Sequence, residues 1–206
     1  MQSSNNLLER VIKGSSIVLL LTFLVTPLGY LIRTFYSRTL SIEDYGLFFA
    51  VNTFFNLIAI YTDLGFGYTV SYLIPKHLKS GDHGSVWNIF RYYQMIQILT
   101  TILVSAILFL SAKYLAVNFF KMESAVNLIY ISCIYLLAVS FFNTLVQLFI
   151  GLQKEKYYAS MNLVRLFFTL SFSIIFFLFD LPNIIFYSIA WVIGYSLAAV
   201  IYTPLS

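Results

Sequence analysis

Six apolar stretches, each about as long as a bilayer core is thick, limit what this chain can fold into. They are residues 14–36, 45–65, 89–111, 126–150, 158–179 and 183–202. A helix needs about 20 apolar residues to cross a bilayer. Only 10% of the 206 residues are charged, whereas soluble domains have about 25%. The sequence therefore predicts an all-α polytopic membrane protein, with six transmembrane helices in residues 14–206 after a polar N-terminal segment, residues 1–13.

Lysine and arginine are unevenly divided between the two sides of these predicted helices. Eight fall on the side of the N-terminus, namely Arg10, Lys13, Lys76, Lys79, Arg91, Lys154, Lys156 and Arg165. Four fall on the other side, namely Arg33, Arg38, Lys113 and Lys121. The positive-inside rule places the richer side in the cytoplasm. We therefore predict a cell-membrane protein with both termini in the cytoplasm, and we do not attribute the net charge of +4 to nucleic-acid binding.

The links between the stretches carry signals for helix starts and ends. Ser41, followed three residues later by Asp44, is a capping pattern that predicts a helix start near Tyr45. After that helix, the segment "YTVSYLIPK" is expected to follow the membrane surface, with Pro75 and the residues after it ending it. Asp180 is expected to cap the last helix.

Five of the six stretches carry polar residues at spacings that place them on one helical face. They are Thr22, Thr26 and Arg33; Asn52, Asn56 and Asp63; Gln94, Gln97, Thr101 and Ser105; Ser140, Asn143, Thr144 and Gln147; and Asn162, Arg165, Thr169 and Ser173. We interpret these faces as the lining of one shared aqueous interior, because they include charges and extend along much of each helix. The alternative is that these side chains only join helices to one another. The sixth stretch has instead Ala190, Gly194 and Ala198, a spacing of small residues typical of close helix packing.

Three charged residues in these faces are candidates for specific roles. Asp63 is a carboxylate in apolar surroundings, which needs a partner or water. It could bind a coupling cation, pair with an arginine, or cap the next helical segment. Arg33 and Arg165 have the planar guanidinium that suits phosphate, although near a helix end an arginine can also extend to the membrane boundary. The substrate-cavity candidates are Arg33, Asn52, Asn56, Asp63, Gln97, Asn143, Gln147 and Arg165.

Sequence motifs of enzymes are missing. His77 and His83 lie in one link, without the metal-binding or nucleophile patterns that hydrolases carry. The single cysteine, Cys133, excludes an intrachain disulfide and a cysteine-based metal site. No phosphate-binding glycine-rich loop is present either. We therefore predict that the chain is not an enzyme, and that it has no catalytic residue, metal or cofactor.

Two segments of the sequence resemble segments of a known family. "SRTLSIEDYGLFFAVNTFFNLIAIYTDLGFG" resembles the first loop and second helix of polysaccharide flippases, with Arg38, Leu40, Ser41, Glu43, Tyr45, Gly46, Leu47, Asp63, Leu64 and Gly65 at the recurring positions. "GLQKEKYY", residues 151–158, is similar to the link between helices 4 and 5 of that family.

This resemblance, to O-antigen-type flippases of the multidrug/oligosaccharidyl-lipid/polysaccharide (MOP) exporter superfamily, implies a fold and a function. The fold would be the N-terminal six-helix lobe of a MATE-like transporter, completed by a second lobe or a partner chain. The function would be the flipping of a polyprenyl-linked oligosaccharide across the membrane by alternating access, with a proton or sodium ion as coupling ion and Asp63 as its candidate site. The competing interpretation is a six-span structural or permease subunit that needs a partner chain.

Overall fold

The computed structural model describes the backbone of residues 2–205 and the side chains of residues 16 and 18–204. All regular structure in this part of the chain is helical: α1 (Gln2–Thr39), α2 (Ile42–Thr62), α3 (Phe66–Lys79), α4 (His83–Leu110), α5 (Ala112–Tyr114), α6 (Ala125–Gly151), α7 (Glu155–Leu178) and α8 (Ile184–Tyr202). A π-helical segment, Leu115–Phe119, follows α5, and a 3-10 turn, Thr203–Leu205, follows α8. Six of the described helices are long and apolar enough to cross a membrane. The predicted all-α, six-span fold is confirmed.

Most of the membrane-spanning helices begin earlier than the sequence predicted, and α1 and α2 show why. α1 already begins at Gln2, so the backbone of the polar segment 1–13 is helical from Gln2, while its side chains lie outside the described residues. α2 begins at Ile42, where the backbone N–H of Asp44 donates to Ser41 Oγ at 3.1 Å. The predicted cap is therefore confirmed. The helix includes polar residues before its apolar stretch because a capped first turn has its N–H groups satisfied.

The cap predicted for the last helix is wrong. Asn183, rather than Asp180, precedes the helix, and its Oδ1 accepts a hydrogen bond from Ile185 N–H at 3.1 Å. Asp180 lies in the turn before it with a φ of 54°. Aspartate tolerates this left-handed conformation better than most residues do.

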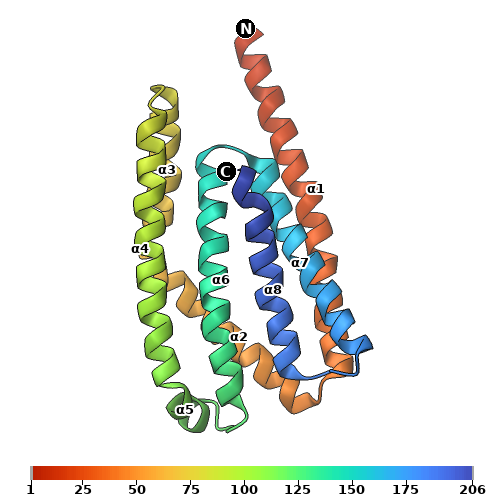
Figure 1. Ribbon diagram of the computed structural model, residues 1–206. Coiled ribbons are helices and arrows are strands. Elements are labelled where there is room, and N and C mark those ends of the chain that lie inside the picture. The colour runs from red at the N-terminus through yellow and green to blue at the C-terminus, as the bar shows by residue number, and fades with distance from the viewer. Residues whose placement is uncertain (1, 206) are drawn as a thin grey trace.

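The second crossing of the bundle is made by two helices, α2 and α3. Between them Leu64 and Gly65 have left-handed φ values of 50° and 79°, which change the direction of the chain. Glycine adopts this conformation without steric cost. In Figure 1 the two helices together run from one end of the bundle to the other. The N- and C-terminal ends, the α3–α4 turn and the α6–α7 link all lie at the same end. Which side of the membrane that end faces stays a prediction.

α3 packs along α4 and α6 with one side buried and the other exposed, and this position corrects the predicted surface segment. It runs beside α4 (Figure 1) with Val70 and Ile74 buried. Ile74 lies against Gly151 of α6, where an added Cβ would come within 3.0 Å of the isoleucine. Pro75 lies within the helix, which ends only at Lys79. The apolar side of an amphipathic helix is buried more completely against protein and lipid than in the headgroup region, where it stays partly hydrated. The more complete burial gives the more favourable free energy.

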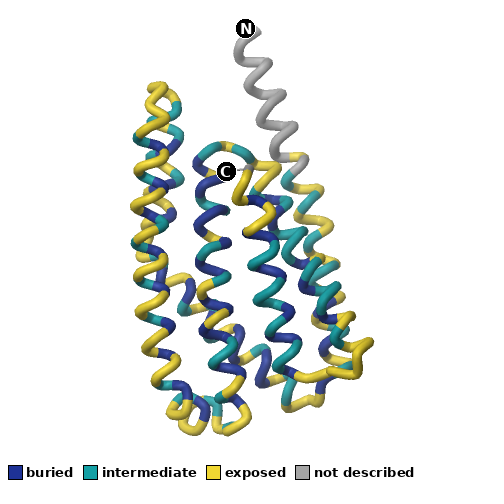
Figure 2. Tube along the Cα trace, in the orientation of Figure 1, coloured by how far each residue is buried: buried dark blue, intermediate teal, exposed yellow. Residues whose placement is uncertain are grey.

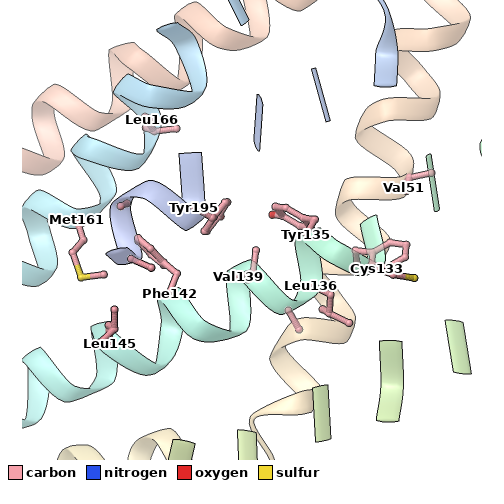
Figure 3. Packing of buried hydrophobic residues seen from close by; sticks show 14 of the residues in the cluster. Val51, Cys133, Tyr135, Leu136, Val139, Phe142, Leu145, Met161, Leu166 and Tyr195 are labelled. Carbon is pink, nitrogen blue, oxygen red and sulfur yellow. The ribbon is translucent and has the colours of Figure 1, made fainter. Parts of the chain in front are cut away.

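The core is organised around α6, which has the largest buried share of the six candidate spans. Figure 2 shows α6 and α8 largely buried and α4 exposed along its outer side. In Figure 3 Tyr135 of α6 and Tyr195 of α8 point toward each other, and their ring centroids are 5.3 Å apart. Rings at this separation attract beyond their buried area. α1 remains at the edge, with Phe23 and Leu24 exposed as expected for residues that face lipid.

Candidate functional site

A cleft of about 500 Å³ lies between α1, α2, α7 and α8, and we call it the polar cleft. Its lining combines charged, amide and hydroxyl side chains with aromatic and aliphatic ones: Val25, Thr26, Gly29, Tyr30, Ile32, Arg33, Phe49, Asn52, Thr53, Asn56, Arg165, Leu166 and Trp191. Polar groups inside a membrane protein face the bundle interior or a water-filled path, because lipid offers them no hydrogen bonds.

Two arginines give the polar cleft a positive charge. On α7, the guanidinium carbon of Arg165 lies 4.5 Å from the centroid of the Tyr195 ring, and Nη1 donates to Tyr195 Oη at 2.9 Å. Arg165 Nε is buried without a hydrogen-bond partner. On α1, the guanidinium carbon of Arg33 lies 5.7 Å from the centroid of the Phe49 ring. Among the described side chains no carboxylate oxygen lies within 4.0 Å of a nitrogen of either arginine.

An unneutralised guanidinium next to low-dielectric protein attracts an anion much more strongly than one in water does. The fork of donors on each arginine matches a phosphate or a carboxylate, to which it can donate two parallel hydrogen bonds. The cleft is therefore suited to an anionic group of a bound molecule.

The side of the cleft formed by α2 presents two amides. Asn56 Oδ1 accepts from Tyr135 Oη at 3.1 Å, and its Nδ2 donates to the carbonyl oxygen of Asn52 at 2.8 Å. Asn52 Nδ2 donates in turn to the Phe48 carbonyl oxygen at 3.0 Å. Trp191 of α8 also lines the cleft, and its indole Nε1–H is buried. Amides and an indole are groups that can bond to the hydroxyls and cover the apolar faces of a polar ligand.

A second set of polar residues is closed inside the bundle, between α2–α3, α4 and α6, and we call it the polar seam. Gln97 Nε2 donates to Ser140 Oγ at 2.9 Å and to Thr62 Oγ1 at 3.3 Å. Ser140 and Thr101 share a further hydroxyl bond of 2.8 Å. Farther along, Ser71 Oγ donates to Gln147 Oε1 at 2.7 Å. Such bonds join membrane helices at about 0.6 kcal/mol each on average.

Asp63 lies at the edge of the polar seam, at the break between α2 and α3. Its Oδ1 accepts from Tyr93 Oη at 2.7 Å, and its Oδ2 accepts from the backbone N–H of Gly67 at 3.1 Å. Gly67 is in the first turn of α3, so the carboxylate satisfies one of the unpaired N–H groups there. Of the three roles that the sequence left open for Asp63, these contacts favour the capping role.

The structure thus separates the eight candidate residues. Four line the polar cleft: Arg33, Asn52, Asn56 and Arg165. Three belong to the polar seam: Asp63, Gln97 and Gln147. Asn143 is exposed and belongs to neither set.

The expectation of one interior lined by five helices is corrected accordingly. The polar faces of α4 and α6 bond to each other through Gln97, Thr101 and Ser140, and none of these three residues lines the polar cleft. No group of three potential metal-ligating side chains is present among the described residues.

The sequence reasoning did not single out Trp191 and Tyr195. Amides, hydroxyls and charges at helical spacing predict a polar face, whereas the small residues of α8 at such spacing predict only close packing. That packing role is confirmed, because Ala190, Gly194 and Ala198 are all buried. The missed signal was the spacing of Trp191 and Tyr195, which places both aromatic rings on one face of the same helix.

Comparison with known proteins agrees with this fold. A family model described as "Polysaccharide biosynthesis protein" matches residues 11–205. An uncharacterized membrane protein of Methanocaldococcus jannaschii is 26% identical over 207 residues, which cover 94% of this chain and 40% of that protein. The chain thus spans about two fifths of that relative's length. No solved structure matches the chain. With six candidate spans and a match over nearly its whole length, this multi-pass membrane protein belongs to the polysaccharide biosynthesis protein family.

Proposed function

We propose that this chain is the N-terminal, six-helix lobe of a MATE-like transporter, and that it flips a polyprenyl-linked oligosaccharide across the cell membrane by alternating access. One observation carries the proposal. Between membrane helices, the polar cleft holds two arginines with no carboxylate partner among the described side chains, and two amides lie beside them. The family match supports a role in polysaccharide synthesis.

The proposed substrate has three chemically distinct parts, and the surroundings of the cleft offer a partner for each. Arg33 and Arg165 would bind its diphosphate through charge-assisted hydrogen bonds. Asn52, Asn56 and Trp191 would bind the sugar. The polyprenyl chain would lie on the exposed apolar side of α1, which borders the cleft and carries large apolar side chains such as Leu31.

The proposal includes a second lobe and a coupling ion. The cleft would become a closed path only when another six-helix lobe or partner chain covers its open side, and the chain alone would not transport. A proton or a sodium ion would drive the exchange, with Asp63 as the candidate residue. Neutralising Asp63 would weaken its bond to Gly67 N–H, and would thus loosen the break between α2 and α3. Both termini would lie in the cytoplasm.

The proposal is tested by reconstitution. The protein is purified from its native membrane with any chain that accompanies it, and is placed in vesicles that carry a lipid-linked oligosaccharide in one leaflet. We expect the substrate to appear in the other leaflet faster than in protein-free vesicles, as measured by its accessibility to a membrane-impermeant glycosidase. If the lipid-linked oligosaccharide appears in the other leaflet no faster than in protein-free vesicles, the flippase proposal is contradicted. The alternative of a permease or structural subunit would then remain.

A further inference from the structure

The turn between α3 and α4 carries charge and aromatic groups that the proposed transport cycle does not use. In Figure 1 this hairpin extends beyond the α6–α7 link at its end of the bundle. Lys76 and Lys79 lie in the last turns of α3, and exposed tyrosines, Tyr68 and Tyr72, precede them on the same helix. Tyrosine near a helix end with lysine beyond it is the usual pattern at a membrane–water boundary.

The outer face of α3 is hollowed at this place. An open groove of about 570 Å³ is lined by Ser71, Tyr72, Pro75, Lys76, Lys79 and Ser80. The spacings of four and three residues put Tyr72, Lys76 and Lys79 on one face of the helix. We call this the lysine groove. It lies beside the buried side of α3, which carries Val70 and Ile74, and Ser71, which bonds to Gln147 of α6, lines its edge.

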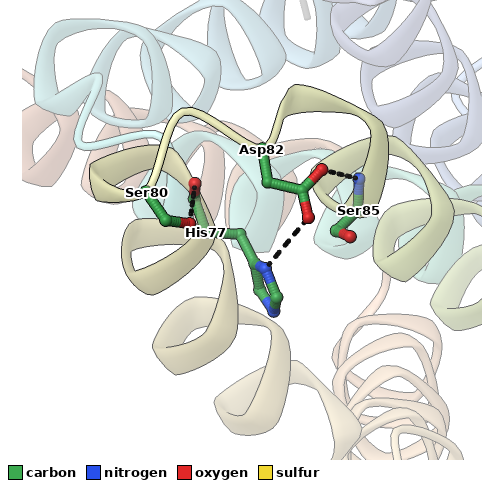
Figure 4. Close-up of polar contacts among 4 residues, drawn as sticks. All are labelled: His77, Ser80, Asp82 and Ser85. Carbon is green, nitrogen blue, oxygen red and sulfur yellow. Dashed lines mark hydrogen bonds and ion pairs between the residues drawn. The ribbon is translucent and has the colours of Figure 1, made fainter.

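Among the described side chains, no carboxylate pairs with the lysines of the groove. Asp82 is the one acidic residue between Phe66 and Arg91, and it is engaged elsewhere. Figure 4 shows its carboxylate between His77 Nδ1, at 3.7 Å from Oδ2, and Ser85 N–H, which donates to Oδ1 at 3.0 Å.

The hydrogen bonding with Ser85, together with the nearby imidazole of His77, holds the pKa of the Asp82 carboxyl below its usual value. Asp82 thus stays an anion that caps α4 and interacts with His77. The ammonium groups of Lys76 and Lys79 have no carboxylate within 4.0 Å among the described side chains.

We propose that the lysine groove binds the phosphate of an anionic phospholipid. The two ammonium groups would contact the headgroup, and the Tyr72 ring would lie beside the glycerol and the first carbons of the chains. Lysines at the membrane surface each contribute about 1 kcal/mol to the attraction of anionic lipid, which for two of them amounts to a preference of about 30-fold. The site is separate from the polar cleft, so the inference does not depend on the transported substrate.

The test uses a tryptophan placed in the groove by Tyr72→Trp. Trp87→Phe and Trp191→Phe remove the two natural tryptophans, so that fluorescence reports on the groove alone. The full protein is placed in vesicles with brominated phosphatidylglycerol or brominated phosphatidylcholine, whose bromines quench nearby indole. We expect quenching to show a preference for phosphatidylglycerol of about 30-fold at low salt.

Two pairs of substitutions then decide the source of this preference. K76Q/K79Q should bring the two lipids to nearly equal quenching. K113Q/K121Q removes the same charge from exposed lysines at the opposite end of the bundle (Figure 1) and should leave the preference intact. Excess inorganic phosphate at constant ionic strength should not abolish it.

The proposal is overturned by equal quenching in the parent protein, by an unchanged preference in K76Q/K79Q, or by displacement of the lipid by free phosphate. Absence of quenching by either lipid would overturn it as well, because it would mean that protein covers the groove.

Discussion

Replacement of Arg165 by glutamine is expected to lower the initial rate of lipid-linked oligosaccharide translocation, at limiting substrate, by about 10- to 100-fold. A hydrogen bond to a charged group contributes about 1.5–3 kcal/mol when the partner is buried, and 1.4 kcal/mol corresponds to a factor of ten. Arg165 has a buried Nε without a partner and no neighbouring carboxylate among the described side chains. Besides the bond to Tyr195, its loss therefore removes donors for which the described residues offer no partner. The rate is measured in the vesicle assay described above.

Two control variants separate binding from structure in this experiment. Arg91→Gln makes the same charge change at an exposed residue of α4, outside the polar cleft, and should leave the rate unchanged. Tyr195→Phe removes the 2.9 Å bond to Arg165 but keeps the guanidinium. If Arg165 only held Tyr195 in place, Tyr195→Phe would slow translocation as much as Arg165→Gln does. Equal rates for Arg165→Gln and the parent protein would remove the arginine from the proposed mechanism.

Replacement of Gly194 by valine is expected to destabilise the bundle by about 3 kcal/mol, the upper part of the range for overpacked cores. Gly194 is buried where α8 touches α7. A Cβ there would collide with Thr169 Oγ1, and would come within 2.9 Å of the backbone carbonyl oxygen of Arg165, which cannot turn away. The two helices would have to separate at the level of Arg165, so the cleft would also change shape. The measurement is the free energy of unfolding in a detergent titration.

Gly46→Ala is the matched control for this substitution. Gly46 lies in α2, and nothing lies within 4 Å of the position of an added Cβ. That substitution should be neutral or slightly stabilising, because alanine favours a helix more than glycine does. Thr169→Ala in the Gly194→Val background should recover part of the stability, since it removes the hydroxyl but not the carbonyl. A Gly194→Val protein as stable as the parent would show that α7 and α8 are not in close contact here.

The helices could be predicted from the sequence because apolar length alone determines which segments can cross a bilayer. Their starts were harder to predict, since caps such as Ser41 and Asn183 act on the backbone and allow polar residues into the first turns. The path of α3 could not be predicted. It depends on two left-handed residues, Leu64 and Gly65, whose effect on direction appears only in three dimensions.

Only part of the candidate site could be predicted, and the reason is similar. Polar residues at helical spacing indicate that a helix has a polar face. They do not show whether that face contacts water or the polar face of another helix. Arg165 and Asn52 turn toward the polar cleft, whereas Gln97 finds Ser140 across the α4–α6 contact. The arginines would have been the better guide, because both line the cleft, whereas hydroxyls, amides and the carboxylate of Asp63 find partners on neighbouring helices.

The central claim is that the polar cleft is open to water and the polar seam is closed, and cysteine labelling tests it most directly. Thr53 is exposed and lines the cleft, while Thr101 is fully buried in the seam. Each is replaced by cysteine in a Cys133→Ala background, which has no other thiol, and is exposed in vesicles to a water-soluble thiol reagent. The account predicts rapid labelling for Thr53→Cys, slowed by lipid-linked oligosaccharide, and no labelling for Thr101→Cys. Equal labelling at the two positions, or protection of both by lipid alone, would contradict it.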